Sequence, residues 1–89
     1  MAEVVMYTAD YCGYCWAARR LLAKKGVAYR EIDITGDIEK RRWLRDVTGR
    51  HTVPQIFVDG TPLGGYTDVA RLERAGSLDA LLRGGHGGP

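Results

Sequence analysis

The feature that most constrains the fold is an alternation of short apolar runs with an amphipathic segment near the N-terminus. Glu3–Tyr7 is a run of strand-forming residues, and Val27–Ile34 is a second run that alternates loosely. Between them, apolar residues recur at the spacing of one helix face: Tyr14, Ala17, Ala18, Leu21 and Leu22. A helix between two strands favours a right-handed parallel crossover, so this part is predicted to be a β-α-β unit.

A second helix is predicted to begin after an Asp37 N-cap and to end at Gly49. It is followed by two short apolar runs within Gln55–Leu63, and the Asp59-Gly60 pair between them is typical of a two-residue hairpin turn. The apolar stripe of this second helix is thin and consists of Ile38, Leu44 and Val47, with Trp43 packed beside it.

A last helix is predicted to begin near Thr67-Asp68 and is interrupted at Gly76-Ser77. Residues 84–89 are rich in glycine and are predicted to be a disordered tail. The resulting order, β-α-β-α-β-β-α, predicts an α/β fold in which a small mixed sheet carries helices on both faces.

Composition narrows the class of protein. Thirteen basic and eleven acidic side chains leave a formal charge of +2, too mild a bias to indicate nucleic-acid binding. No stretch approaches the ~18 apolar residues of a membrane span, and Met1–Met6 resembles folded protein rather than a signal peptide. We therefore expect one cytoplasmic domain that has no nucleic-acid or membrane partner.

Both cysteines fall within Cys12-Gly13-Tyr14-Cys15, where the first strand leads into the first helix. A bridge between them closes a tiny loop and removes little chain entropy, so the pair is predicted to be reactive rather than structural. Cys12 is expected at the helix N-terminus, where free N–H groups and the helix dipole favour the thiolate, with a minor contribution from the basic residues along the helix. Cys15, one turn further, is expected to be more buried and able to attack a mixed disulfide on Cys12.

Three other interpretations of the cysteine pair are weaker. A zinc site needs two more ligands, and the two histidines, His51 and His86, have a spacing that fits no zinc finger or ribbon. Inert core cysteines are unusual at a strand-to-helix junction with a glycine between them. A structural disulfide is disfavoured by the small loop and the expected cytoplasmic setting.

Two further segments invite functional interpretation. Thr52-Val53-Pro54 is either a simple loop before a strand or a cis-proline turn opposite the cysteines, which leaves the Val53 N–H and C=O free to pair with an extended peptide. Gly64-Gly65-Tyr66-Thr67-Asp68 allows close backbone approach at a helix start, where N–H groups can bind a carboxylate and Asp68 an ammonium group. Alternatively, Thr67 or Asp68 is only an N-cap.

Together, Cys12-Gly13-Tyr14-Cys15, Thr52-Val53-Pro54 and Gly64–Asp68 resemble the motifs of the glutaredoxins, in their order and spacing. Val53–Asp59 is also similar to the small bacterial dithiol members, and the resemblance extends to about Leu82. It implies a glutaredoxin domain over residues 1–83 with a thioredoxin-like fold, a four-stranded mixed sheet and a cis Pro54. The implied activity is glutathione-dependent reduction of protein disulfides and of glutathione mixed disulfides, by a monomer.

The resemblance also implies residue roles. Cys12 attacks the target, and Cys15 resolves the mixed disulfide when the target is a protein disulfide. Glutathione, the co-substrate, is expected to be bound by Tyr14, Thr52, Val53, Pro54, Thr67 and Asp68. Within that set, Val53 pairs with the cysteinyl part, while Thr67 and Asp68 hold the γ-glutamyl end.

Two departures from the family pattern matter. Ala9 takes the place of a lysine found in many members, which predicts weaker glutathione binding or a smaller thiolate fraction at Cys12, unless Arg50 or Arg42 substitutes. Gly13 replaces the commoner proline, as in some members that hold a [2Fe-2S] cluster through Cys12 and glutathione. An iron–sulfur carrier or sensor, or a redoxin reduced by a flavoprotein reductase, are therefore the alternative functions.

Trp16 directly follows Cys15 and is predicted to be a partly buried helix aromatic. The alternative is an exposed indole that shapes a docking face for a partner protein.

Overall fold

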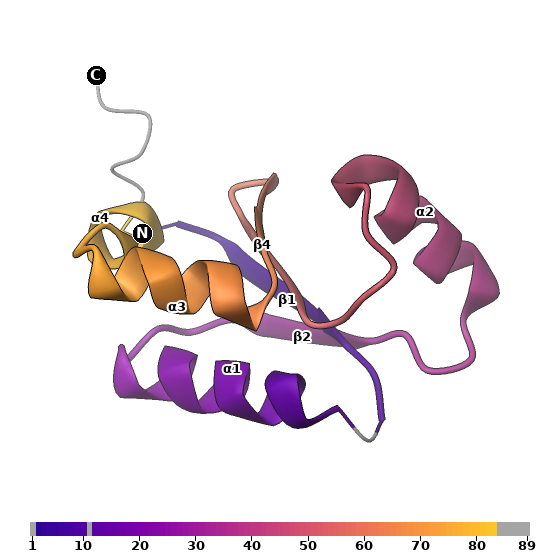
Figure 1. The fold of residues 1–89 in the computed structure, drawn as a ribbon, viewed down its shortest axis with the longest axis horizontal. Coiled ribbons are helices and arrows are strands. Elements are labelled where there is room, and N and C mark those ends of the chain that lie inside the picture. Colours follow the sequence, from indigo (N-terminus) through magenta and orange to yellow (C-terminus); the bar gives the residue numbers. More distant parts are fainter. Residues whose placement is uncertain (1, 11, 84–89) are drawn as a thin grey trace.

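A computed structural model describes residues 2–10 and 12–83 of the chain, so the predicted tail at 84–89 lies outside the described residues. Four strands form one mixed sheet in the order β2-β1-β3-β4 (Figure 1). The strands are β1 (Val4–Thr8), β2 (Arg30–Asp33), β3 (Gln55–Val58) and β4 (Thr61–Gly64). The helices are α1 (Gly13–Lys24), α2 (Ile38–Thr48), α3 (Tyr66–Arg74) and α4 (Leu78–Leu82).

The sheet confirms the predicted connections. Strands β1 and β2 are parallel, as expected for two strands joined by α1, whereas β3 is antiparallel to both β1 and β4. Asp59 and Gly60 both have positive φ angles, 50° and 81°, which is the backbone of a type I′ hairpin turn. The last helix is divided at Gly76, as predicted, into α3 and α4.

Two strand boundaries differ from the prediction. Thr8, predicted to be in a loop, is the last residue of β1; its side chain is buried and donates a hydrogen bond to the Glu31 carboxylate. Strand β2 is shorter than Val27–Ile34 because its pairing with β1 begins only at Arg30, opposite Val5, the second residue of β1.

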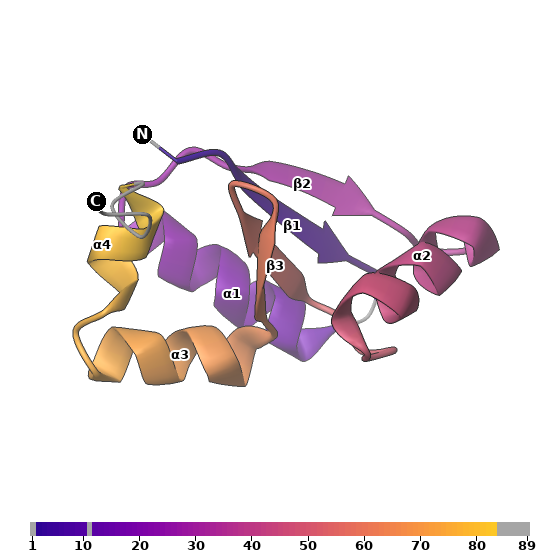
Figure 2. The same cartoon turned by 90° about the horizontal axis from the view of Figure 1, so that it is seen from above.

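Helices cover both faces of the sheet. Helices α1, α3 and α4 lie on one face, where Figure 2 shows α1 and α3 below the strands. Helix α2 packs on the opposite face through Leu44, which joins Ile34 and Phe57 in a smaller cluster. The larger cluster consists of Ala2, Val4, Met6, Ala18, Leu22, Ile56, Val58, Val69, Leu78 and Leu82. None of the described helices is long and apolar enough to cross a membrane.

On α1, the structure covers most of the predicted apolar face, fully at Ala18 and Leu22 and partly at Ala17 and Leu21, but not Tyr14. Cys15, Ala18 and Leu22 are buried, but Tyr14 is 62% exposed and Trp16 is 58% exposed. The buried stripe is rotated towards Cys15 because that side of the helix faces the sheet. The prediction that Trp16 is partly buried is therefore wrong: its indole lies at the surface under the Arg20 guanidinium.

On α2, only Leu44 of the predicted apolar stripe is buried, whereas Ile38 is 71% exposed and Val47 is 45% exposed. The helix contacts the sheet over a short length at the end of the strands, so little of its stripe is covered. Trp43 is partly exposed but packs as predicted, because its ring stacks on Phe57 with centroids 5.9 Å apart. Asp37 is the N-cap and Gly49 is the C-cap, as expected.

Candidate active site

Cys12 is the N-cap residue of α1, as predicted from the junction of strand and helix. Its Sγ accepts a hydrogen bond from the Cys15 N–H at 3.1 Å, and the thiol donates to the Val53 carbonyl at 3.4 Å. The sulfur therefore lies against the free N–H groups at the positive end of the helix, an environment that stabilises negative charge on sulfur.

Cys15 is fully buried, whereas Cys12 is partly exposed, and both thiols are free. Burial raises the pKa of the Cys15 thiol to about 12, and the hydrogen bond with Cys12 adds to this effect. One cysteine is thus accessible to a partner while the other is held as a neutral thiol one helical turn away. This asymmetry matches the predicted order of burial.

The Val53–Pro54 peptide bond is cis, which decides between the two interpretations of this segment. The loop that carries this bond is held in place by Gln55 at the start of β3, whose buried side-chain amide donates a hydrogen bond to the Thr52 carbonyl at 3.0 Å. The contact between Cys12 and the Val53 carbonyl places this loop opposite the cysteines, as the cis-proline interpretation requires.

The start of α3 is shaped by two glycines and one carboxylate. Gly64 has φ +110°, and a Cβ there would lie 2.5 Å from Asp68 Oδ2, so only glycine fits. Gly65 is the N-cap, which corrects the alternative that assigned this role to Thr67 or Asp68. Asp68 lies three residues further on, and its carboxylate accepts the Gly65 N–H at 2.9 Å.

Asp68 also forms an ion pair with Arg50, from the loop that precedes the cis proline. The Arg50 guanidinium, with help from the Gly65 N–H, holds the pKa of the Asp68 carboxyl below its usual value. This pairing links the α2–β3 loop to α3, so Arg50 lies at the Asp68 end of the site. The suggestion that Arg50 replaces the missing lysine beside Ala9 has no contact in this structure to support it.

An open groove of about 300 Å³ runs between the cis-proline loop and the start of α3. It is lined by Tyr14, Arg50, Thr52, Val53, Pro54, Gly65, Tyr66 and Thr67. Five of the predicted site residues therefore line one groove; Cys12 joins it through Val53, and Asp68 joins it through Arg50.

Two residues that were not predicted from the sequence, Tyr66 and Gln55, also contribute to the groove and to the loop beside it. The Tyr66 ring stacks on Tyr14 with centroids 6.1 Å apart, and together they form one wall of the groove. Tyr66 stood within a motif that was singled out, so its position beside Thr67 was the available signal. No sequence signal pointed to the hydrogen bond between Gln55 and Thr52.

The basic residues of α1 contribute less positive charge near Cys12 than their number suggested. Arg19 forms a bidentate pair with Glu31 on β2, and Lys25 pairs with Glu73 and Asp79. Their charges are compensated locally, so the helix terminus rather than these side chains dominates the electrostatics at the sulfur.

A β-α-β unit with two free cysteines at its helix start, opposite a cis-proline loop, defines a thiol–disulfide oxidoreductase of the thioredoxin-like fold. The glutaredoxin family model matches residues 4–63. Glutaredoxin 3 of Escherichia coli (strain K12) is 45% identical over 83 residues, which cover 93% of this chain and 100% of that protein. The chain belongs to the glutaredoxin family.

Solved structures agree with this assignment. The solution structure of glutaredoxin from Brucella melitensis superimposes with a TM-score of 0.86 at 42% identity, covering 96% of this chain and 92% of that one. A crystal structure of a buckwheat glutaredoxin–glutathione complex gives a TM-score of 0.85 at 29% identity, covering 93% of this chain and 78% of that one. The family assignment therefore holds at the level of both sequence and fold.

Proposed function

We propose that this protein reduces glutathione mixed disulfides and protein disulfides, with glutathione as the electron donor. The observation that carries the proposal is the groove between the cis-proline loop and the start of α3, whose lining residue Val53 contacts the Cys12 sulfur through its carbonyl. Glutathione has a peptide-like middle with an ammonium and a carboxylate at one end. Such a groove offers a partner for each of these groups.

The cis-proline loop is suited to hold the cysteinyl part of glutathione. The Val53 main chain is at the edge of a loop, so it can pair with an extended tripeptide as a neighbouring strand would. Thr52 and Pro54 flank it within the groove, and the half-exposed Tyr14 ring supplies an apolar wall. In this proposal the glutathione sulfur is directed towards Cys12.

The γ-glutamyl end is assigned to the start of α3. Its carboxylate is bound by the N–H groups of the first helical turn near Thr67, where the helix dipole is positive. Its ammonium group is bound by the Asp68 carboxylate, whose charged form is further stabilised by Arg50 and the Gly65 N–H, which lower its pKa. Asp68 shares its two oxygens between Arg50 and the ligand in the bound state.

On a glutathionylated protein, the Cys12 thiolate attacks the glutathione sulfur. The S–S bond to the protein breaks, and the protein cysteine leaves as a thiolate and takes up a proton. A second glutathione thiolate then attacks the mixed disulfide on Cys12, releasing oxidised glutathione and regenerating the Cys12 thiolate. Two glutathione molecules are thereby joined, and one protein thiol is freed.

On a protein disulfide, the mixed disulfide forms between Cys12 and one target cysteine. Cys15 then attacks the Cys12 sulfur, its proton passes to the departing target thiolate, and a Cys12–Cys15 disulfide remains. Two glutathione molecules reduce that disulfide. Because burial keeps Cys15 protonated, it does not compete with Cys12 for the target. It attacks only after the mixed disulfide has formed, as its proton passes to the departing target thiolate.

A coupled assay with glutathione, glutathione reductase and NADPH tests the proposal on a glutathionylated peptide. We expect Cys12→Ser to abolish turnover and Cys15→Ser to retain a substantial part of it, while both variants lose reduction of protein disulfides. Turnover that depends on a flavoprotein reductase and not on glutathione would favour the alternative redoxin function. Equal loss in both variants on the glutathionylated peptide would contradict the assigned roles.

The place of the missing lysine is open to direct test. Ala9→Lys adds a cation close to the turn before Cys12, so we expect tighter glutathione binding and faster alkylation of Cys12 at low pH. Ala9→Gln is the matched neutral control. An unchanged pH dependence of alkylation in the lysine variant would show that a cation here has no influence.

Cluster carriage is the second candidate function, because Gly13 leaves the approach to Cys12 open. Gly13 is exposed, and among the described residues no group beyond its chain neighbours and its own helix backbone lies within 4 Å of where its Cβ would stand. Cys12 of each of two copies, with two glutathione thiols, would supply the ligands of a [2Fe-2S] cluster. Anaerobic reconstitution followed by visible absorption spectroscopy tests this: a coloured dimer supports it, and a colourless monomer contradicts it.

A further inference from the structure

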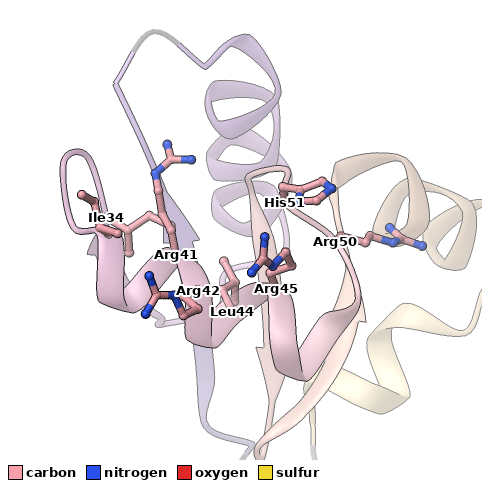
Figure 3. A pocket seen from close by; sticks show the side chains of 8 residues that line it. Ile34, Arg41, Arg42, Leu44, Arg45, Arg50 and His51 are labelled. Carbon is pink, nitrogen blue, oxygen red and sulfur yellow. The ribbon is translucent and has the colours of Figure 1, made fainter.

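The outer side of α2 and the loop after it enclose a basic hollow of about 270 Å³ (Figure 3). Its floor is apolar and is formed by the buried residues Ile34 and Leu44. Its rim carries Arg41, Arg42, Arg45, Arg50 and His51. We call this surface, with its floor and rim, the arginine hollow.

Apart from Arg50, the arginines of the arginine hollow are not used to hold the fold together. Arg41, Arg42 and Arg45 form no ion pair with any of the residues the structure describes, and all three are exposed. Elsewhere, Arg19 and Lys25 both have carboxylate partners. Like charges four residues apart on a helix, as at Arg41 and Arg45, are mildly destabilising. Folding therefore gives no reason for this cluster.

The arginine hollow adjoins the groove between the cis-proline loop and the start of α3, which we call the glutathione groove. Arg50 lines both, and in Figure 3 its guanidinium points away from α2 towards α3, in line with its ion pair to Asp68. In the same view His51 and Arg45 lie between Arg50 and the side chains of Arg41 and Arg42. A substrate whose glutathione part occupies the groove therefore has the unpaired arginines beside it.

We propose that the arginine hollow docks an acidic segment of the protein whose cysteine carries glutathione. This inference rests on the proposed function, because the groove next to the hollow is assigned to the glutathione part of that substrate. The hollow would then bind the protein part of the substrate and would favour substrates with Asp or Glu close to the modified cysteine.

The chemistry of the rim favours carboxylates. An arginine guanidinium binds a carboxylate through two parallel N–H donors, and three such groups along one turn of helix can accept two neighbouring acidic side chains. The exposed Ile38 side chain and the apolar floor add a surface for the stem of a peptide side chain. A nucleic acid fits less well, because the hollow is short and the whole chain carries a formal charge of only +2.

The test compares three glutathionylated peptides that differ only in the two residues on each side of the cysteine: aspartates, asparagines or lysines. In the coupled assay at low salt, we expect kcat/KM for the acidic peptide to exceed that for the neutral peptide by about three- to tenfold, as for two exposed charge pairs. The basic peptide should be the poorest, and 0.5 M salt should remove most of the difference because it screens exposed charges.

The decisive variant is Arg42→Gln/Arg45→Gln, which removes two unpaired charges outside the glutathione groove. It should lower kcat/KM for the acidic peptide to that of the neutral peptide and leave the neutral peptide unchanged, which also shows that the variant is folded. Lys24→Gln/Arg74→Gln is the matched control, because it removes the same charge from exposed positions elsewhere. This control should keep the preference for the acidic peptide.

Different failures have different meanings. No turnover of the neutral peptide by the unmodified protein would overturn the proposed function itself. Turnover without a preference for the acidic peptide, or a preference that survives in Arg42→Gln/Arg45→Gln or is lost in the Lys24/Arg74 control, would overturn only the docking inference. A single-stranded oligonucleotide that binds more tightly than a cysteine-free acidic peptide, through the same two arginines, would also overturn it.

Discussion

Helices cover both faces of the sheet, but they bury different amounts of apolar surface. The face under α1, α3 and α4 carries the larger cluster of buried side chains, together with Cys15 and the start of α3. The face under α2 has a small cluster around Leu44, and the outer surface of that helix is basic. Because apolar burial is the main favourable term in folding, the first face supplies most of the stability.

This difference indicates which surface positions can change without a large loss of stability. A helix that buries one leucine tolerates an unusual surface, and unpaired arginines on α2 cost little stability because they remain in water. The α1 face has no such freedom, since its packing sets the position of the cysteine pair.

Removing one buried leucine from each face tests the comparison directly. We expect Leu22→Ala to lower the free energy of unfolding by about 3–4 kcal/mol and Leu44→Ala by about 2 kcal/mol, because the half-exposed surroundings of Leu44 can relax into the space. Urea unfolding monitored by circular dichroism measures both. Val47→Ala, at an exposed site on α2, should change little. Equal losses at the two leucines would break the comparison.

Gly64→Ala probes the junction that carries the site on the first face. A methyl group at φ +110° would stand 2.5 Å from the Asp68 carboxylate, so we expect a loss of about 1–3 kcal/mol and weaker glutathione binding. Gly36→Ala, before α2, is the control: it shares a positive φ, 75°, but has nothing within 4 Å of the new methyl group. If both variants bind glutathione equally well, the close approach of Gly64 to Asp68 is not required for glutathione binding, which would contradict this prediction.

Asp37→Ala tests how far α2 depends on its own ends. The Asp37 carboxylate accepts the Lys40 N–H at 2.9 Å, and loss of an N-cap costs about 1 kcal/mol. Because the core under α2 is small, we expect faster hydrogen exchange within α2 while the amides of α1 change little. Asp46→Ala, an exposed acid in the same helix, should leave exchange unaltered. Uniform acceleration across both helices would contradict a locally weak α2.

The smallest expected effect is a loss of stability in acid. The Arg19 guanidinium lowers the pKa of Glu31 below its ordinary 4.5, and Arg50 lowers that of Asp68 below 3.8. Both carboxylates titrate at lower pH when folded, so their contribution is present above these ordinary values and is lost as the pH falls through the folded ones. The contribution is modest because both pairs are partly solvated.

Urea midpoints measured from pH 7 to pH 3 should therefore be flat down to about pH 5 and fall below it. Glu31→Gln should be less stable at neutral pH and should lose less on acidification. The arginines of α2 have no ion pair within the described residues, so Arg45→Gln should leave this pH profile unchanged. A profile that falls already between pH 7 and pH 6 would contradict the assignment to carboxylates.

Local signals predicted much of the fold. The hairpin at Asp59-Gly60, the cap at Asp37 and the division at Gly76 each depend on the conformational preferences of one or two residues, which is why they were readable. The exposure of Tyr14 and Trp16 could not be predicted from the sequence pattern. Periodicity identifies a possible apolar face, but whether another element covers that face depends on where the sheet lies.

The candidate site shows the same division. The Cys12-x-x-Cys15 spacing, together with the preceding strand, was enough to predict a redox pair with Cys12 at the start of a helix. The partners of that pair were not encoded locally. Arg50 and Asp68 are 18 residues apart in the sequence and come from a loop and a helix. The residues next to each of them therefore do not predict their ion pair.

By itself, the sequence determined the order of elements, the turn residues and a pair of cysteines too close together to staple the chain. These follow from short-range sterics and from spacing along the chain. Only the tertiary structure decided that Cys12 contacts the Val53 carbonyl, 41 residues away, and that the α2 arginines of the arginine hollow have no ion pair with the residues the structure describes. Distance between remote segments, and access to water, are properties of packing, and packing exists only once the sheet has assembled.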